Sequence, residues 1–116
     1  MHEMAIVNNL LNECEKIAKQ KNAKKINAVY VSLGRLSGVE EHYFKEAFNA
    51  FVQDENSIYY KAKLYVSVCE LELFCFDCAK NCIQEKNEFI CKHCSSVNVK
   101  VLKGDEMLLN SIELDV

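Results

Sequence analysis

Two pairs of cysteines constrain this chain more than any other feature of its sequence. Each pair has two residues between its members, and twelve residues separate the pairs. Two such tight turns can offer four sulfur atoms to one tetrahedral metal ion. Four thiolates suit zinc or a rubredoxin-like single iron, and zinc is favoured because structural sites of this form are closed and redox-silent. The pattern therefore predicts a zinc site formed by Cys75, Cys78, Cys91 and Cys94.

The total of seven cysteines needs a separate explanation. In a secreted protein this density indicates disulfides, but the first residues lack the basic start of a signal peptide, so metal-binding thiolates are favoured. A redox dithiol is disfavoured because neither pair has the strand-to-helix context of thioredoxin. We interpret the other three cysteines as a core, a strand and a loop residue: Cys14, Cys69 and Cys82. We interpret His93 as an exposed loop residue.

Composition limits the partners of this 116-residue chain. Its length suffices for one modest domain, or for one domain that carries a small metal-stabilised lobe. The net charge of −3 argues against a protein that neutralises phosphates, so we expect no nucleic-acid partner. No apolar run approaches the roughly 20 residues of a membrane span. We therefore expect no membrane partner and a cytoplasmic location.

Hydrophobic periodicity predicts an α+β fold. Apolar residues three or four apart predict a helix over residues 6–21, and the sequence from Ser37 to Glu40 resembles a capping box that starts a second helix. Alternating or β-branched runs predict strands over residues 26–33, 62–73, 97–101 and 107–116. We expect two helices on a small three-stranded mixed sheet, with an inserted zinc-ribbon or rubredoxin-like lobe. Residues 1–72 and 104–116 would form the α/β domain, and residues 73–103 the zinc lobe.

The N-terminus offers a second set of metal donors. The α-amine of Met1, the backbone amide of His2 and the imidazole Nδ1 of His2 can close two fused chelate rings. Three nitrogen atoms in one plane suit Ni(II) or Cu(II). The fourth position would be open to the amide of Glu3, to His93 or to a group on a receiving protein. The alternative is that His2 is an ordinary frayed terminal residue.

Several stretches together resemble the HypA/HybF family of nickel-insertion accessory proteins for [NiFe]-hydrogenase maturation, and the likeness covers essentially the whole chain. Besides both cysteine pairs, the matching stretches are Met1-His2-Glu3, Gly34 to Glu40, Gly104 to Met107 and Ser111 to Leu114. Ala5 departs from the family, which often has Ser or Thr there. Ala79 and Ser95 also depart, because glycine often follows such cysteine pairs.

The resemblance implies a nickel metallochaperone and not an enzyme. His2 would carry nickel, with the Met1 amine and Glu3 assisting, and the four cysteines of the two pairs would carry structural zinc. The protein would pass Ni(2+) to the hydrogenase large-subunit precursor in cooperation with the GTPase HypB. In some relatives the same apparatus also serves urease, so urease accessory proteins are further candidate partners.

Two other classes of function remain open from the residues alone. A zinc-ribbon interaction module would use the zinc site for structure and leave His2 without a role. A redox protein would use the cysteine pairs without a bound metal. A smaller question concerns Glu40, Glu41 and His42, which could steady a cation or simply form the solvated first turn of a helix.

Overall fold

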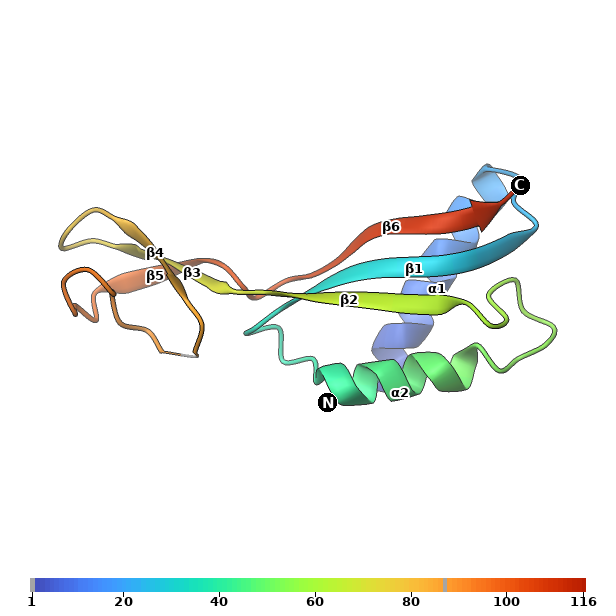
Figure 1. Ribbon diagram of the computed structural model, residues 1–116, viewed down its shortest axis with the longest axis horizontal. Coiled ribbons are helices and arrows are strands. Elements are labelled where there is room, and N and C mark those ends of the chain that lie inside the picture. The colour runs from blue at the N-terminus through green and yellow to red at the C-terminus, as the bar shows by residue number, and fades with distance from the viewer. Residues whose placement is uncertain (1, 87) are drawn as a thin grey trace. The chain divides into compact units, whose positions relative to one another are not determined.

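The computed structural model describes residues 2–86 and 88–116 (Figure 1). Its backbone contacts group the chain into two compact units. The first, which we call the α/β unit, comprises the chain up to Val31, Val39–Ser67 and Leu109–Val116. The second, which we call the cysteine unit, comprises Ser32–Gly38 and Val68–Leu108. The domain limits expected from the sequence stay a prediction.

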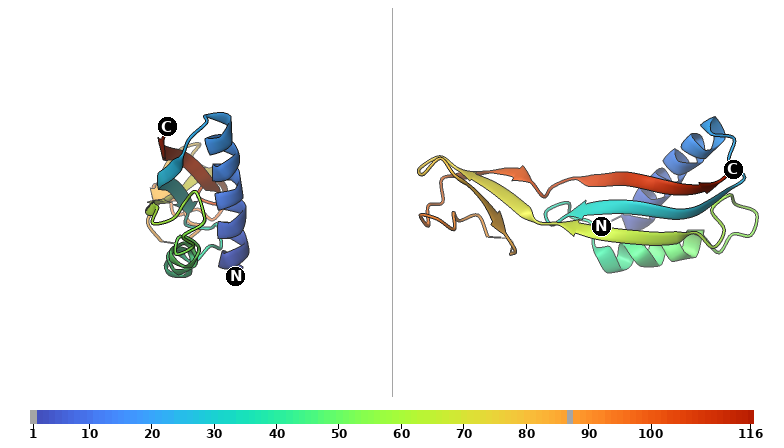
Figure 2. Two further views of the ribbon diagram at one scale, coloured as in Figure 1. Left: turned by 90° about the vertical axis from the view of Figure 1, so that its right-hand side faces the viewer. Right: turned by 45° about the horizontal axis from the view of Figure 1, so that its top comes forward.

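Two helices and a three-stranded mixed sheet form the frame of the α/β unit, as the sequence predicted. The helices are α1 (Glu3–Gln20) and α2 (Glu41–Phe51). The strands are β1 (Lys25–Gly34), β2 (Lys63–Cys69) and β6 (Met107–Asp115), in the spatial order β2-β1-β6. β1 and β2 run in the same direction and β6 runs in the opposite one (Figure 2).

The core of the α/β unit comes from the apolar stripes of both helices and from the central strand. The stripe of α1 buries residues three or four apart, as a helix with one covered face requires: Val7, Leu10, Leu11, Cys14 and Ala18. α2 contributes Phe44, Ala47 and Phe48, and Phe51 is only half-buried. β1 is the central strand of this sheet and is buried along most of its length. This core holds α1, whose N-cap residue is His2.

The cysteine unit contains a second sheet, in the order β4-β3-β5. Its strands are β3 (Leu71–Cys75), β4 (Asn81–Gln84) and β5 (Val99–Lys103), and β3 pairs antiparallel with both neighbours. The core of this unit is small and consists of Leu71, Leu73 and Cys82, with Leu36 and Val99 packed against it. Such a core provides little hydrophobic stabilisation, so a bound metal would contribute much of the stability.

Two local predictions were wrong, and one strand was missed. The N-cap of α2 is Glu40 and not Ser37, so the presumed capping box does not start the helix. The single strand predicted over residues 62–73 is two strands in different sheets, and β4 was not predicted. At the break, Arg35 donates hydrogen bonds from Nη2 to both carboxylate oxygens of Glu70, at 3.0 and 2.9 Å. This pair fixes Glu70, the residue between β2 and β3, and strand periodicity cannot reveal such a contact.

No helix in the described part of the chain is long and apolar enough to cross a membrane.

Candidate metal sites

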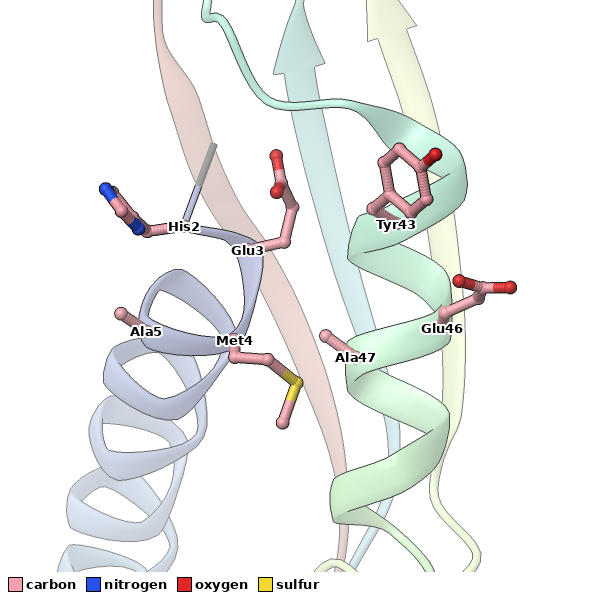
Figure 3. A pocket seen from close by; sticks show the side chains of 7 residues that line it. All are labelled: His2, Glu3, Met4, Ala5, Tyr43, Glu46 and Ala47. Atoms are coloured by element: carbon pink, nitrogen blue, oxygen red, sulfur yellow. The ribbon is translucent and has the colours of Figure 1, made fainter.

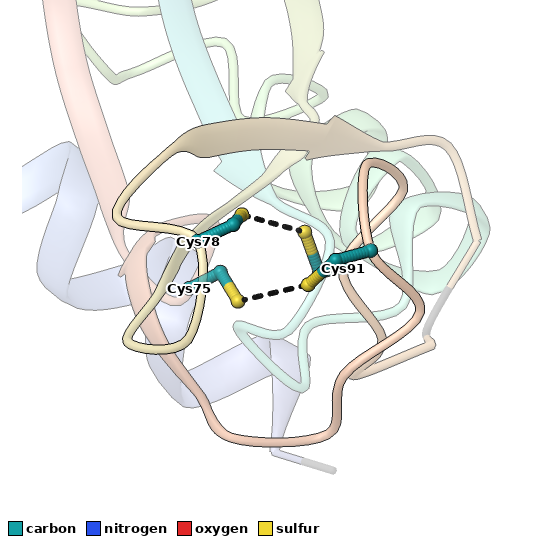
Figure 4. Close-up of side chains that lie close together, drawn as sticks. Cys75, Cys78 and Cys91 are labelled. Atoms are coloured by element: carbon teal, nitrogen blue, oxygen red, sulfur yellow. Dashed lines mark hydrogen bonds between the residues drawn. The ribbon is translucent and has the colours of Figure 1, made fainter.

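The four cysteines of the two pairs converge on one point in the cysteine unit (Figure 4). We call this group the cysteine cluster; it consists of Cys75, Cys78, Cys91 and Cys94. All four sulfur atoms lie within 4.8 Å of one another. The Cys75 and Cys94 sulfurs are 3.5 Å apart, and the Cys78 and Cys91 sulfurs are 3.7 Å apart. Among the described residues, this is the one group of three or more potential metal-binding side chains that converges in this way.

Two similar backbone turns position the cluster. Cys75, at the end of β3, donates its N–H to the carbonyl of Lys80, and Cys91 donates its N–H to the carbonyl of Ser96, each at 2.9 Å. The residue after each pair adopts a left-handed conformation, with φ of 55° at Ala79 and 61° at Ser95. Glycine adopts this conformation without the steric cost of a Cβ atom, which explains its frequent use after such pairs.

Asp77 links the two turns, and the sequence analysis did not identify it. Its carboxylate accepts a hydrogen bond from Asn98 Nδ2 at 3.2 Å and another from the Ser96 hydroxyl. These two hydrogen bonds, with that from Ser96 the larger effect, lower the pKa of Asp77. In the sequence, Asp77 is recognisable only as a polar residue between the two members of a cysteine pair. The contact partners lie beyond the second pair and cannot be inferred from spacing.

The dimensions and electrostatics of the cluster fit a divalent cation. Four sulfurs at about 2.3 Å from a tetrahedral zinc lie about 3.8 Å apart, close to the two distances above. Burial raises the pKa of the Cys91 thiol, but hydrogen bonds from the amides of Cys94 and His93 outweigh burial and lower it to about 6. The Ser96 amide lowers the pKa of Cys94, but Cys75 and the other cluster members raise it to about 12. Four thiolates this close need a cation to offset their charge.

Two residues of the second donor set, His2 and Glu3, lie at the start of α1 (Figure 3). His2 is the exposed N-cap residue of this helix, and its ring points away from α2. Met1, the other predicted nitrogen donor, lies outside the described residues. Glu3 is the first helical residue and is only 7% exposed. Its Oε2 accepts a hydrogen bond from the backbone N–H of Glu40 at 3.2 Å. The Glu3 carboxylate therefore supplies the side-chain acceptor at the start of α2.

An open pocket of about 670 Å³ lies between the first turn of α1 and α2. Met4 extends into the space between the helices, and Tyr43 and Glu46 form the α2 side (Figure 3). The pocket lining also includes His2, Glu3, Ala5 and Ala47. His2, which contributes to this lining, is thus accessible from solvent.

The other predicted candidates are placed as follows. His42 is exposed on α2 and its Nε2 lies 3.2 Å from Glu46 Oε1, while Glu41 pairs with Lys45. His93 Nε2 lies 3.2 Å from the carbonyl oxygen of Asn81, in the cysteine unit. The three remaining cysteines do not belong to the cluster: Cys14 and Cys82 are buried in cores, and Cys69 is half-buried at the end of β2.

A small mixed α/β unit with an exposed N-terminal histidine, together with a unit built around four cysteines, defines a class of small metal-handling proteins. Comparisons with known proteins give the particular family. A family described as "Hydrogenase/urease nickel incorporation, metallochaperone, hypA" matches residues 1–114. The hydrogenase maturation factor HypA of Aquifex aeolicus is 40% identical over 116 residues, which are 100% of this chain and 99% of the relative. HypA of Campylobacter jejuni is 38% identical over 109 residues, which are 94% and 95% of the two chains.

Solved structures agree with this result. The solution structure of the nickel metallochaperone HypA from Helicobacter pylori matches with a TM-score of 0.70 and 34% identity, and the match covers 99% of this chain and 98% of that one. The chain therefore belongs to the HypA family of nickel-incorporation metallochaperones for hydrogenase and urease. The description of this family names a metallochaperone. The resemblance and the fold class predicted from the sequence are both confirmed.

Proposed function

We propose that this protein captures Ni(II) at its N-terminus and transfers it to an apo-enzyme precursor, while zinc in the cysteine cluster maintains the fold of the cysteine unit. The observation that carries the nickel assignment is the exposed His2 at the open start of α1. Its Nδ1, its backbone amide and the amine of Met1 supply three nitrogen donors, a set that suits Ni(II). Glu3 assists through its backbone amide, because its carboxylate is bonded to Glu40.

The zinc assignment is supported by the spacing and chemistry of the cysteine cluster. Its sulfur separations of 3.5 and 3.7 Å suit a closed tetrahedral site. Zinc has no redox chemistry there and offers no open position, so its role is structural. Nickel would be the cargo, bound weakly at the N-terminus, and zinc the structural cofactor, bound in the cysteine cluster.

Membership of a family described by hydrogenase and urease nickel incorporation supports the following partners for the proposed transfer. The [NiFe]-hydrogenase large-subunit precursor receives the nickel, and a HypB-type GTPase cooperates in the delivery. Urease accessory proteins are the second candidate delivery system. All of these steps take place in the cytoplasm.

Calorimetric titration of Ni(II) into untagged, zinc-loaded protein tests the nickel site. The chain has three histidines, so His42→Ala and His93→Ala are matched controls for His2→Ala. We expect the parent and both controls to bind about one equivalent at the planar nitrogen site, and His2→Ala to lose that binding. Acetylation of the α-amine of Met1 removes one of the three nitrogen donors and should weaken nickel binding as His2→Ala does.

Zinc content and folding must be checked in every variant, so that loss of nickel binding is not confused with unfolding. Equal nickel binding by His2→Ala and the parent would reject the N-terminal site. It would favour a zinc-ribbon interaction module, whose only metal is in the cysteine cluster. Loss in His93→Ala instead would move the nickel site to the cysteine unit.

A further inference from the structure

The β4-β3-β5 sheet has an outer side that neither metal site uses. Leu73 and Cys75 of β3 point into the cysteine unit, so Phe74 and Phe76, which alternate with them, point to the other side. The rings of Phe74 and Phe76 meet edge to face, with centroids 5.3 Å apart. Phe76 is 53% exposed, and with Phe74 and the neighbouring Ile83, 58% exposed, it forms a group of apolar side chains on this side.

Positive charge surrounds this aromatic pair. Lys100 lies opposite Phe74 in the pairing of β3 with β5, and its Nζ is 5.9 Å from the centroids of both rings. Lys103 and Ile83 lie on either side of Glu72, on β5 and β4. We call the outer side formed by these residues the aromatic face; it consists of Glu72, Phe74, Phe76, Ile83, Lys100 and Lys103.

A shallow hollow of about 380 Å³ extends the aromatic face along β4. Its lining includes Glu72 and Ile83 from the face, and Lys92 and His93 from the second cysteine turn. The ion pairs among the described residues are Arg35–Glu70, His42–Glu46 and Lys45–Glu41. None of them neutralises the two lysines of the face, Lys100 and Lys103, or Lys92 of the hollow. Against three cationic side chains the face presents one carboxylate, that of Glu72.

We propose that the aromatic face is a docking site for an acidic segment of a partner protein that carries an aromatic or aliphatic anchor residue. The aromatic pair and Ile83 would bury the anchor, and the lysines would pair with carboxylates around it. Nucleic acid fits less well, because phosphate binding needs a more extensive basic surface than three lysines beside a carboxylate. This role goes beyond nickel capture and does not depend on the N-terminal site.

Titration of ¹⁵N-labelled, zinc-loaded full-length protein tests the docking site. The probe is a short synthetic peptide of Asp and Glu around a central Phe-Leu pair. We expect shifts in amide signals of β3, β4 and β5, and weaker binding as salt is raised. Phe76→Ser and Lys100→Glu should each lower the affinity about tenfold. His2→Ala should bind the peptide as the parent does, which separates this test from that of the nickel site.

Matched controls come from the same unit. Val97 is apolar and 75% exposed but lies outside the sheet, so Val97→Ser should leave binding unchanged. Lys86 is exposed beside a different hollow and gives the charge control Lys86→Glu. The proposal is overturned by an absence of shifts in the three strands, or by equal losses in variants and controls. Equal binding of a peptide with Lys and Arg in place of Asp and Glu, or preferential binding of oligo-dT, also overturns it.

Discussion

Glu3 lies next to His2 in the sequence, but its carboxylate is bonded to the start of α2. Removing that group in Glu3→Ala leaves the backbone N–H of Glu40 without this acceptor. We expect a loss of about 1–2 kcal/mol in the free energy of unfolding. Glu3→Gln keeps an acceptor oxygen and loses only the favourable charge at the helix N-terminus, so its loss should be about 0.5 kcal/mol. Urea unfolding of the zinc-loaded proteins measures both values.

Nickel titration of Glu3→Gln distinguishes the two possible roles of this residue. If Glu3 acts through its backbone amide and by positioning α1, the Gln variant keeps nearly all of the nickel affinity of the parent. A large loss of affinity in a protein that remains as stable as expected would instead make the carboxylate a direct ligand.

Ala79 has a φ of 55°, a conformation that costs a residue with a Cβ atom about 1 kcal/mol. Ala79→Gly removes this cost, partly offset by the greater flexibility of glycine in the unfolded chain. We expect a net stabilisation of about 0.5–1 kcal/mol, and slower loss of zinc to a chelator. Ala50, exposed in α2, is the matched control, since Ala50→Gly should destabilise the protein by about 1 kcal/mol. Equal destabilisation by both changes would contradict the prediction.

At the scale of single elements, the burial of Cys14 on α1 makes the stability of the protein depend on pH. Burial, with a smaller contribution from the Glu13 carboxylate, raises the pKa of this thiol to about 11. In the unfolded chain the pKa of the thiol is near its ordinary value of 9.0, so between these values the folded state binds more protons. The stability that Cys14 provides is fully present below pH 9 and is lost as the pH rises through about 11.

Cys14→Ala tests this linkage. The variant should be less stable than the parent by about 1 kcal/mol near neutral pH, because it leaves a small cavity against the apolar stripe. Between about pH 9 and 11 its stability should fall less steeply than that of the parent. Parallel urea unfolding curves across that range measure the difference. The same slope in both proteins would mean that Cys14 does not ionise on unfolding.

The elements differ in how far the sequence could predict them. α1, α2 and β6 were predicted because each has a periodic apolar pattern, and β1 because its run of β-branched and aromatic residues is typical of a strand. The start of α2 and the break between β2 and β3 were not, because both depend on contacts between distant residues. Glu3 lies 37 positions from Glu40, and Arg35 lies 35 positions from Glu70. The convergence of the cysteines was predictable because their spacing carries the geometry, whereas the role of Asp77 depends on residues beyond the second pair.

At the scale of the whole molecule, the two units differ in what stabilises them. The α/β unit has two helices and buries large side chains such as Phe44 and Phe48. The cysteine unit has a core of three buried residues with two more packed against it, too small to maintain a fold without a metal. Removing zinc with a chelator should therefore abolish the chemical-shift dispersion of the amide signals of β3, β4 and β5. Those of α1 and α2 should keep their dispersion.

Nickel binding should survive this treatment, because the proposed nitrogen donors and the carboxylate of Glu3 all lie in the α/β unit. The test is nickel calorimetry on protein that has lost zinc and whose accessible thiols have then been alkylated, so that sulfur cannot take up nickel. Cys14 should escape alkylation because it is fully buried and its pKa is raised, and its reactivity reports whether the α/β unit has stayed folded. About one equivalent of nickel bound, with Cys14 protected, supports independent sites. Loss of nickel with Cys14 still protected would show that the cysteine unit is needed for nickel capture.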